Sequence, residues 1–569
     1  MSLLDLRDLS VSLHGTPLLS EVNLTLNQGE IFGLVGESGS GKSLTALALM
    51  GLLPEGATGT GSARFDGQDL LALKEPALCQ IRGKRIAMIF QEPMTALNPL
   101  MTIGDQVAET LRVHGRVSRA EARATARARL DRVGLSAPRF PLSLYPHELS
   151  GGQRQRVAIA LAIALRPALL IADEPTTALD VTTQAQILDL LRGLVEEERM
   201  SLLLITHDLA VIANLAGRTA VMKSGRIVEQ GPTETLFRNR THPYTRALFA
   251  ASTHQPAPGP RRGTLRGEYL HQKETEPASF WQKYSPPTAP DSRPPAPENT
   301  LLTVTHAERS YRLPRPSAFA AHPLLRAVDD VSFSIFAGES LGLVGESGCG
   351  KSTLTRAILG LETLQGGAIT LNGAPVSRAM PAPLRAQVQV VFQDPYGSFN
   401  PRHRIDRLIA EPFHLTGLPA DWPERVAEAL REVGLSPDDR HKYIHEFSGG
   451  QRQRIAIARA LIIRPALIVL DEAVSALDVR VRAQVLDLLA QLRESHDLAY
   501  LFISHDLSVV RAITSRVLVM QAGKIVEEGA SEDVFAAPRH PYTATLVAAT
   551  PQIPPDWMAA RLEGETHAT

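Results

Sequence analysis

The chain repeats itself, and this duplication constrains its fold more than any other feature. The 569-residue sequence contains GLVGESG at Gly33–Gly39 and again at Gly342–Gly348. It contains SGGQRQR at Ser150–Arg156 and at Ser448–Arg454. Later pairs, ITHDL with ISHDL and two copies of HPYT, keep the same separation as the SGGQRQR pair. A repeat of this length is a whole domain rather than one unit of a solenoid.

The duplication predicts two domains joined by a linker. We expect the first domain over 1–251, the linker over 252–299 and the second domain over 300–569. The linker is rich in proline and poor in apolar periodicity, which favours an extended, semi-rigid tether. A passive connection is the simpler interpretation, and Trp281 and Tyr284 are the only hint of a docking point.

The overall composition excludes several classes of protein. A formal net charge of -1 argues against a nucleic-acid binder held by a dominant basic surface. The 2 cysteines, Cys79 and Cys349, cannot form a disulfide framework or a four-thiolate metal site. The first residues lack the apolar core of a signal peptide, and no stretch is apolar enough to span a membrane. Any membrane role therefore requires a partner.

Strand and helix patterns alternate within each copy. Short apolar runs predict strands, and each is followed by a glycine turn, an acidic pair or a histidine; they are 31–35, 168–172, 202–206, 341–344, 466–470 and 500–504. Helices are expected over 44–53 and 354–361, directly after the glycine turns. Continuous apolar strands of this kind suit a parallel sheet that is covered on both faces, so the fold class is α/β.

Each copy carries the phosphate-binding pattern GxxxxGK[ST] between a predicted strand and a predicted helix. Glycines let backbone N–H groups converge on phosphate oxygens, and the following helix presents its positive end. The lysine can neutralise the β- and γ-phosphates, and the serine offers a hard oxygen to Mg²⁺. The residues expected to bind nucleotide are Gly36, Ser38, Gly39, Ser40, Gly41, Lys42 and Ser43 in the first copy and Gly345, Ser347, Gly348, Cys349, Gly350, Lys351 and Ser352 in the second.

An acidic pair follows a predicted buried strand in each copy. Asp173 and Asp471 are placed to hold Mg²⁺, and Glu174 and Glu472 to orient or deprotonate the attacking water. A single acidic pair at this position is often only a helix cap. Its recurrence beside each phosphate loop favours the catalytic interpretation.

The motifs LSGGQ at 149–153 and FSGGQ at 447–451 identify the family that the chain resembles, the ABC transporter ATPases. The resemblance covers nearly all of both copies. It implies tandem P-loop NTPase domains, each with a RecA-like, mostly parallel sheet core, an antiparallel β subdomain and a helical signature subdomain. It also implies that each ATP is held between the phosphate loop of one domain and the signature of the other. The signature residues expected at the nucleotide are Ser150, Gly151, Gly152, Gln153, Ser448, Gly449, Gly450 and Gln451.

Further family elements match residue by residue. Gln91 and Gln393 correspond to the glutamine that senses Mg²⁺ and the permease, so the expected metal set is Ser43, Gln91, Asp173, Ser352, Gln393 and Asp471. His207 and His505 correspond to the switch histidine at the γ-phosphate, and they join Glu174 and Glu472 as expected catalytic residues. Ala178-Leu179-Asp180 and Ala476-Leu477-Asp478 correspond to the loop at the dimer interface.

The family's adenine-stacking aromatic is matched in only one copy. Tyr311 fits this role upstream of the second phosphate loop, whereas the first copy offers Leu13 and His14. Adenine stacking is therefore expected to be weaker in the first copy. No catalytic residue is missing from either copy, so both sites are expected to hydrolyse ATP with Mg²⁺.

The HPYT tails at 242–245 and 540–543 are similar to those of oligopeptide/dipeptide/nickel importer ATPases. We interpret them as packed extensions rather than solute sites. The fused arrangement resembles the ATPases of microcin C/peptide and glutathione importers. Some members carry an iron–sulfur site after this tail, but this chain has no cysteine there, so none is expected.

The resemblance implies the ATP-hydrolysing subunit of a bacterial importer for peptides or peptide-like solutes. Its expected place is the cytoplasmic face of the inner membrane, as a peripheral subunit on two transmembrane permeases that receive solute from a binding protein. The solute stays open among dipeptides, longer peptides, glutathione, muropeptides, microcin-like compounds and nickel chelates. A soluble two-domain ABC ATPase acting on ribosomes is the alternative; such proteins have a charged helical linker and lack HPYT tails. A DNA-repair ATPase would require zinc cysteines that are absent.

Two further expectations concern single segments. The stretches 92–99 and 394–401, with Met94, Leu97, Tyr396 and Phe399, are candidates for permease docking, with core packing as the alternative. Cys349 lies at a predicted helix N-terminus beside a lysine, which predicts a lowered thiol pKa and a reactive thiolate. Simple space filling is the alternative for this cysteine.

Overall fold

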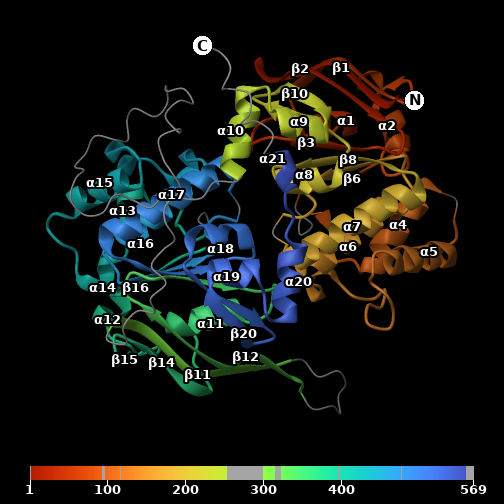
Figure 1. Ribbon diagram of the computed structural model, residues 1–569. Helices are drawn as coiled ribbons and strands as arrows, with labels where there is room; N and C mark the ends of the chain where they lie inside the picture. Colours follow the sequence, from red (N-terminus) through yellow and green to blue (C-terminus); the bar gives the residue numbers. More distant parts are fainter. Residues whose placement is uncertain are drawn as a thin grey trace. The chain divides into compact units, whose positions relative to one another are not determined.

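The structure, a computed structural model, describes residues 2–91, 96–115, 117–177, 179–252, 299–313, 322–394, 397–475 and 477–558. These residues form two compact units, each built around one copy of the repeat (Figure 1). Of the described residues, the first unit holds those within 2–252, 478–480 and 549–558, and the second holds those within 299–477 and 481–548.

A six-stranded sheet forms the centre of the first unit. Its strand order is β10-β9-β3-β8-β7-β6, and all neighbours are parallel except β9 and β10. The strands are β3 (Ile31–Val35), β6 (Ile86–Ile89), β7 (Leu169–Asp173), β8 (Ser201–Thr206), β9 (Arg218–Lys223) and β10 (Arg226–Pro232). Every residue of β7 and β8 is buried, as expected for strands that are covered on both faces.

A separate antiparallel sheet with strand order β2-β1-β4-β5 packs on this core. Its strands are β1 (Ser2–Leu13), β2 (Thr16–Asn27), β4 (Ala57–Phe65) and β5 (Gln68–Asp69). Alternate residues of β2, including Leu24 and Leu26, are buried. These side chains join Phe32 of β3 and Leu203 of β8 in one apolar cluster, which fixes the antiparallel sheet beside the phosphate loop.

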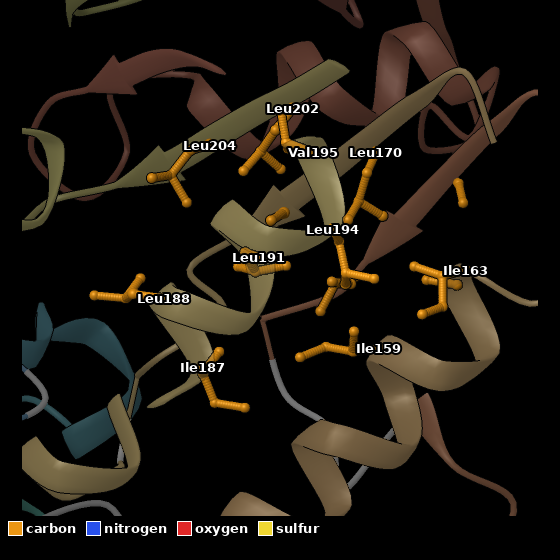
Figure 2. Close-up of a cluster of buried hydrophobic side chains, with 14 of the residues drawn as sticks. Ile159, Ile163, Leu170, Ile187, Leu188, Leu191, Leu194, Val195, Leu202 and Leu204 are labelled. Carbon is orange, nitrogen blue, oxygen red and sulfur yellow. The ribbon is translucent and has the colours of Figure 1, made fainter. Parts of the chain in front are cut away.

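The helices of the first unit cover the sheet and form the signature subdomain. They are α1 (Lys42–Met50), α2 (Glu75–Ile81), α4 (Ile103–His114), α5 (Arg119–Arg132), α6 (Gly151–Ala162), α7 (Val181–Glu198), α8 (Leu209–Leu215), α9 (Thr233–Asn239) and α10 (Pro243–Ser252), with 3₁₀ turns at Leu70–Ala72 and Pro146–Glu148. Helix α7 buries Ile187, Leu191 and Leu194 at helical spacing. Figure 2 shows these side chains among Ile159, Leu170 and Leu202, so the cluster ties the signature helix to the sheet.

The second unit repeats this plan. Its six-stranded sheet has the order β16-β17-β18-β13-β19-β20, and its antiparallel sheet has the order β12-β11-β14-β15. The strands are β11 (Thr300–Arg312), β12 (Leu324–Phe336), β13 (Ser340–Val344), β14 (Gly366–Leu371), β15 (Ala374–Pro375), β16 (Val388–Val391), β17 (Leu467–Asp471), β18 (Ala499–Ile503), β19 (Arg516–Gln521) and β20 (Lys524–Ala530). The helices are α11 (Lys351–Ile358), α12 (Ala382–Ala386), α13 (Ile405–Ile409), α14 (Phe413–Thr416), α15 (Trp422–Glu432), α16 (Gly449–Leu461), α17 (Val479–His496), α18 (Leu507–Ile513), α19 (Ser531–Ala536) and α20 (Pro541–Ala549), with 3₁₀ turns at Pro437–His441 and Ile444–Glu446.

These features confirm the predicted α/β fold with its three subdomains. The helix ends are corrected by local geometry. Helix α1 stops at Met50, because Gly51 adopts a left-handed conformation (φ 63°) and its N–H bonds back to Ala48. Helix α11 likewise stops at Ile358, ahead of the predicted end at position 361.

The C-terminal segment 549–558 packs within the first unit. The ring of Trp557, on α21 (Pro555–Met558), lies edge-on to Phe237 of α9 with a centroid distance of 6.0 Å. Asp556 forms an ion pair with Arg238. Among the described residues, no helix combines the length and hydropathy needed to cross a bilayer. Residues 253–298 of the predicted linker, with Trp281 and Tyr284, lie outside the described residues, whereas Ser252 belongs to α10.

Candidate functional site

The first phosphate loop runs from β3 into α1 and is too tightly packed for other residues at two of its glycines. A Cβ on Gly36 would lie 2.2 Å from the Met222 carbonyl oxygen. At Gly41, φ is 105° and a Cβ would lie 2.5 Å from Leu19. The backbone N–H of Gly225, in the β9–β10 turn, donates to the Ser40 carbonyl at 2.8 Å. The antiparallel sheet and the β9–β10 hairpin together therefore determine the backbone conformation of this loop.

The second phosphate loop has the same geometry. A Cβ on Gly350 would lie 1.9 Å from the Ala327 carbonyl oxygen, and one on Gly345 would lie 2.2 Å from the Met520 carbonyl oxygen. The Gly523 N–H donates to the Cys349 carbonyl at 2.9 Å. The structure thus places all fourteen predicted loop residues at the start of α1 or α11, where a positive helix end favours phosphate.

Cys349 differs from its prediction. Its side chain is buried, and burial raises the pKa of the thiol more than the nearby Lys351 lowers it. The predicted lowering of this thiol's pKa is therefore wrong, because burial shifts the pKa in the opposite direction. A lysine and a helix N-terminus close in sequence do lower the thiol pKa, as predicted, but desolvation of the buried thiol raises it by more.

Both loop lysines turn back toward their own loops. Lys42 Nζ donates to the carbonyl oxygens of Gly36 at 2.7 Å and Glu37 at 2.8 Å. Lys351 Nζ makes the equivalent bonds to Gly345 at 2.7 Å and Glu346 at 2.9 Å. Burial lowers the pKa of Lys42, and the carboxylates of Glu174 and Asp173 oppose this shift. The ammonium group is thus held next to the position where the pattern predicts phosphate.

Glu174 lies at the centre of a hydrogen-bonded cluster in the first unit. It follows the last residue of β7 in a left-handed conformation (φ 46°), which is costly for a non-glycine residue and is often found at functional sites. Its carboxylate accepts bonds from Gln91 Nε2 at 3.1 Å and from Thr177 Oγ1 at 2.9 Å, and it contacts His207 Nδ1 at 3.1 Å. The structure therefore brings together three of the predicted residues, Glu174, Gln91 and His207.

The environment keeps Glu174 ionised. Burial alone raises the pKa of its carboxyl group, but hydrogen bonds from His207 and Thr177 and the charges of His207 and Lys42 outweigh burial and lower the pKa to about 2. An ionised carboxylate only accepts hydrogen bonds, so the proton of this contact is on His207 Nδ1. An ionised carboxylate in this position can therefore orient a water and accept a proton from it.

Asp173 has a different environment. Burial raises the pKa of its carboxyl group to about 6, and the neighbouring Ser43 opposes this shift. Within the described residues its buried Oδ1 has no hydrogen-bond partner. A serine hydroxyl beside a buried carboxylate is a hard-oxygen donor set that fits Mg²⁺. Gln91 donates its amide N–H to Glu174, so its carbonyl oxygen is the atom that it could offer to an ion.

The second unit repeats the acidic pair with fewer contacts to the glutamate. Glu472 is also left-handed (φ 50°), and its Oε1 lies 3.3 Å from His505 Nδ1. Burial raises the pKa of Glu472, but the hydrogen bond and charge of His505 and the charge of Lys351 lower it overall. Burial raises the pKa of Asp471, with the charge of Glu472 adding to it. Ser475 donates to the backbone carbonyl of Glu472 rather than to its carboxylate.

The two signatures begin helices in an identical manner. The Ser150 hydroxyl caps α6 by accepting the Gln153 N–H, and the Gln153 side chain accepts the Ser150 N–H. Ser448 and Gln451 repeat this capping box on α16. A Cβ at the second glycine would lie 2.4 Å from Thr183 in the first unit and 2.2 Å from Val481 in the second, so that position excludes larger residues. The helix N-terminus and its glycines are suited to an anion.

The remaining predicted residues differ between the units. Tyr311 lies near the end of β11 with the Arg309 guanidinium 4.8 Å from its ring centre. Leu13 ends β1, and His14 lies in the following turn with φ 50°. In the stretches considered for permease docking, Leu97 and Phe399 are buried, as the core-packing alternative predicts. Met94, Tyr396, Ala178 and Ala476 lie outside the described residues.

Sequence reasoning missed one set of contacts to the loops. The Tyr244 hydroxyl of the first HPYT tail accepts the backbone N–H of Glu37 at 3.1 Å. Tyr542 of the second tail accepts the N–H of Glu346 at 2.9 Å. The signal was present, because the tails recur at the same separation as the signatures, but no pattern links a tail to a loop about 200 residues earlier.

Comparison with known proteins gives a consistent result. The model of the ABC transporter family matches residues 19–177 and 328–475. The model of the oligopeptide/dipeptide transporter C-terminal region matches residues 228–277 and 526–569. Both models therefore match twice, in the order of the duplication.

Two curated relatives are similar over nearly the whole chain. The peptidoglycan transport ATP-binding protein YejF of Agrobacterium fabrum is 47% identical over 559 residues, covering 96% of each chain. The glutathione import ATP-binding protein GsiA of Salmonella choleraesuis is 46% identical over 553 residues, covering 94% of this chain and 86% of the relative.

Proposed function

This chain belongs to the ABC transporter family, and from that premise we propose that it powers the import of short peptides or peptide-containing solutes. It is an ATPase that binds ATP with Mg²⁺, and it is the ATP-binding subunit of an importer that works with membrane permeases and a solute-binding protein. The comparisons do not support the ribosome-acting alternative.

One observation carries the proposal for the solute. The oligopeptide/dipeptide transporter C-terminal region follows both ATPase domains, and the two relatives are named for peptidoglycan and glutathione transport. Glutathione is a tripeptide, and peptidoglycan contains short peptide stems. Their shared chemistry is a short peptide with free carboxylates, and we propose this class for the present system.

We propose the following roles within each nucleotide site. Lys42 and Lys351 neutralise the β- and γ-phosphates, while the loop N–H groups hold the phosphate oxygens. Glu174 and Glu472 orient and deprotonate the attacking water. His207 and His505 hold these carboxylates in place, at 3.1 and 3.3 Å. When bound, Mg²⁺ neutralises developing phosphate charge; Ser43, Gln91 and Asp173 would hold it in one site and Ser352, Gln393 and Asp471 in the other.

We propose that each signature completes the nucleotide site of the other copy, so that ATP favours a closed pair. ATP can shift the equilibrium between the open and the closed pair only by the factor by which it binds the closed pair more tightly. Closure and reopening would then drive two permease subunits on the cytoplasmic face of the bacterial inner membrane. The solute would contact the binding protein and the permeases rather than this chain.

Reconstitution with the cognate permeases and binding protein in proteoliposomes tests this function. ATP-dependent uptake of glutathione, a dipeptide, a muropeptide and a nickel chelate would be compared. We expect uptake of at least one peptide, and none when both Glu174→Gln and Glu472→Gln are present. Uptake of the nickel chelate alone would contradict the peptide class, and recovery of the chain with ribosomes instead of membranes would contradict the importer.

A further inference from the structure

In each unit, two hydrogen bonds from outside the phosphate loop hold its backbone. The β9–β10 turn holds its second half through Gly225 N–H and the Ser40 carbonyl, at 2.8 Å. The HPYT tail holds its first half through the Tyr244 hydroxyl and the Glu37 N–H, at 3.1 Å. The same pair of contacts recurs in the second unit through Gly523 and Tyr542. An arrangement present in both copies is a feature of the fold rather than an accident of one loop.

The tail is built to place this tyrosine. In the first unit, the Glu229 carboxylate of β10 accepts the backbone N–H groups of Thr241 at 2.9 Å and His242 at 3.1 Å. His242 Nδ1 accepts the Tyr244 N–H at 3.1 Å, at the first turn of α10. Glu527 and His540 make the same bonds before Tyr542. Glu229 and His242 therefore fix the start of α10.

The tyrosine ring is enclosed, so its hydroxyl has little freedom. Tyr244 is 4% exposed and Tyr542 is 8% exposed. Lys223 of β9 lies over the Tyr244 ring, 5.0 Å from its centre. Burial raises the pKa of Tyr244 to about 12, so the hydroxyl is neutral at any physiological pH and can accept the loop N–H.

The peptide held by the tyrosine also contacts the lysine of the loop. The Gly36–Glu37 peptide donates its N–H, that of Glu37, to Tyr244, and its carbonyl oxygen, that of Gly36, accepts Lys42 Nζ at 2.7 Å. The Gly345–Glu346 peptide stands in the same relation to Tyr542 and Lys351, with a lysine contact of 2.7 Å. Rotation of this peptide would turn its carbonyl away from the lysine. The tyrosine therefore restrains both the loop backbone and the direction of the lysine.

We propose that Tyr244 and Tyr542 are positioning residues for nucleotide binding, which hold each phosphate loop in the conformation that receives ATP phosphates. The HPYT tail then stabilises the phosphate loop of the ATP site, in addition to packing against the domain. A loop that is already ordered loses less conformational freedom when it binds phosphate. The proposal rests on ATP binding at these loops.

Single-site binding measurements test the proposal in the second unit. In a chain carrying Lys42→Ala, only the second loop keeps its lysine, and the Kd of a non-hydrolysable ATP analogue with Mg²⁺ is measured by calorimetry. Tyr542→Phe removes the hydroxyl and keeps the ring. We expect the Kd to rise about 3- to 10-fold, the effect of losing one net hydrogen bond. Glu527→Ala, which frees the HPYT segment, should raise the Kd in the same direction.

Tyr500→Phe is the matched control. Tyr500 is also buried in the second unit, and its hydroxyl donates to the Leu489 carbonyl at 2.9 Å, within the core. Both tyrosine variants should lose a similar amount of thermal stability, but only Tyr542→Phe should change the Kd. The reciprocal experiment places Tyr244→Phe in a Lys351→Ala chain.

The outcomes separate this proposal from the function on which it rests. An unchanged Kd in Tyr542→Phe and Tyr244→Phe, with normal binding by their parent chains, would overturn the positioning role alone. No binding of the analogue by the unmodified chain would overturn the ATP assignment, and this inference with it.

Discussion

The Thr177 hydroxyl donates a 2.9 Å hydrogen bond to the carboxylate of Glu174. The corresponding serine, Ser475, donates to the backbone carbonyl of Glu472 instead, also at 2.9 Å. The two proposed general bases thus have different supports, although their strands, lysines and histidines correspond. The two ATP sites are therefore expected to respond differently to the same kind of substitution.

We expect Thr177→Val to slow turnover at the first site by about 3- to 10-fold, because Glu174 loses one of the donors that orient it. Ser475→Ala should change turnover at the second site less than twofold, because its hydroxyl does not reach the carboxylate. Each effect is measured as steady-state ATPase activity in a chain whose other site is inactivated. Thr177→Val is combined with Glu472→Gln, and Ser475→Ala is combined with Glu174→Gln. Equal losses in the two variants would contradict the asymmetry.

Removal of the proposed general base gives a larger effect. Glu174→Gln and Glu472→Gln should each slow hydrolysis at the altered site by about 10²- to 10⁴-fold. The double variant should retain bound ATP, which is measured by nucleotide extraction after gel filtration. Glu197→Gln is the control, because Glu197 is an exposed partner of Arg132 outside the site. Full ATPase activity in the double variant would show that another group activates the water.

The local parts of this molecule follow from its sequence, and the contacts between distant segments do not. Lys42, Asp173 and Glu174 were predictable because each motif lies directly after an apolar strand, and parallel strands bring these ends to one edge. The Tyr244–Glu37 bond joins residues 207 positions apart. No pattern encodes that distance, because it depends on how β10 and α10 fold back over the loop. Burial of Cys349 is likewise a property of the packed domain rather than of its neighbours in sequence.

The HPYT segment should loosen in acid. Burial raises the pKa of Glu229, but hydrogen bonds from the Thr241 hydroxyl and from the backbone N–H groups of Thr241 and His242 lower it overall. A depressed folded-state pKa stabilises the fold above the ordinary glutamate value of about 4.3 and loses that contribution as pH falls through the folded value. Amide exchange of α10 should therefore quicken, relative to α7, as pH falls from about 5 to 3. Glu229→Gln should reduce this pH dependence, and the same dependence in that variant would exclude Glu229 as its source.

The two cysteines should react with maleimide in the order of their exposure. Cys79 is exposed on α2, whereas Cys349 is buried in the second phosphate loop. Burial also raises the pKa of the Cys349 thiol, which keeps it protonated at neutral pH and suppresses the reactive thiolate. Brief treatment at pH 7 should therefore label Cys79 and leave ATPase activity intact. Mass spectrometry of the labelled peptides, with Cys79→Ser as the control that should take up almost no label, measures the order directly. Rapid inactivation of the Cys79→Ser chain, prevented by bound MgATP and abolished by Cys349→Ser, would instead mean that the second loop opens often enough to expose its thiol.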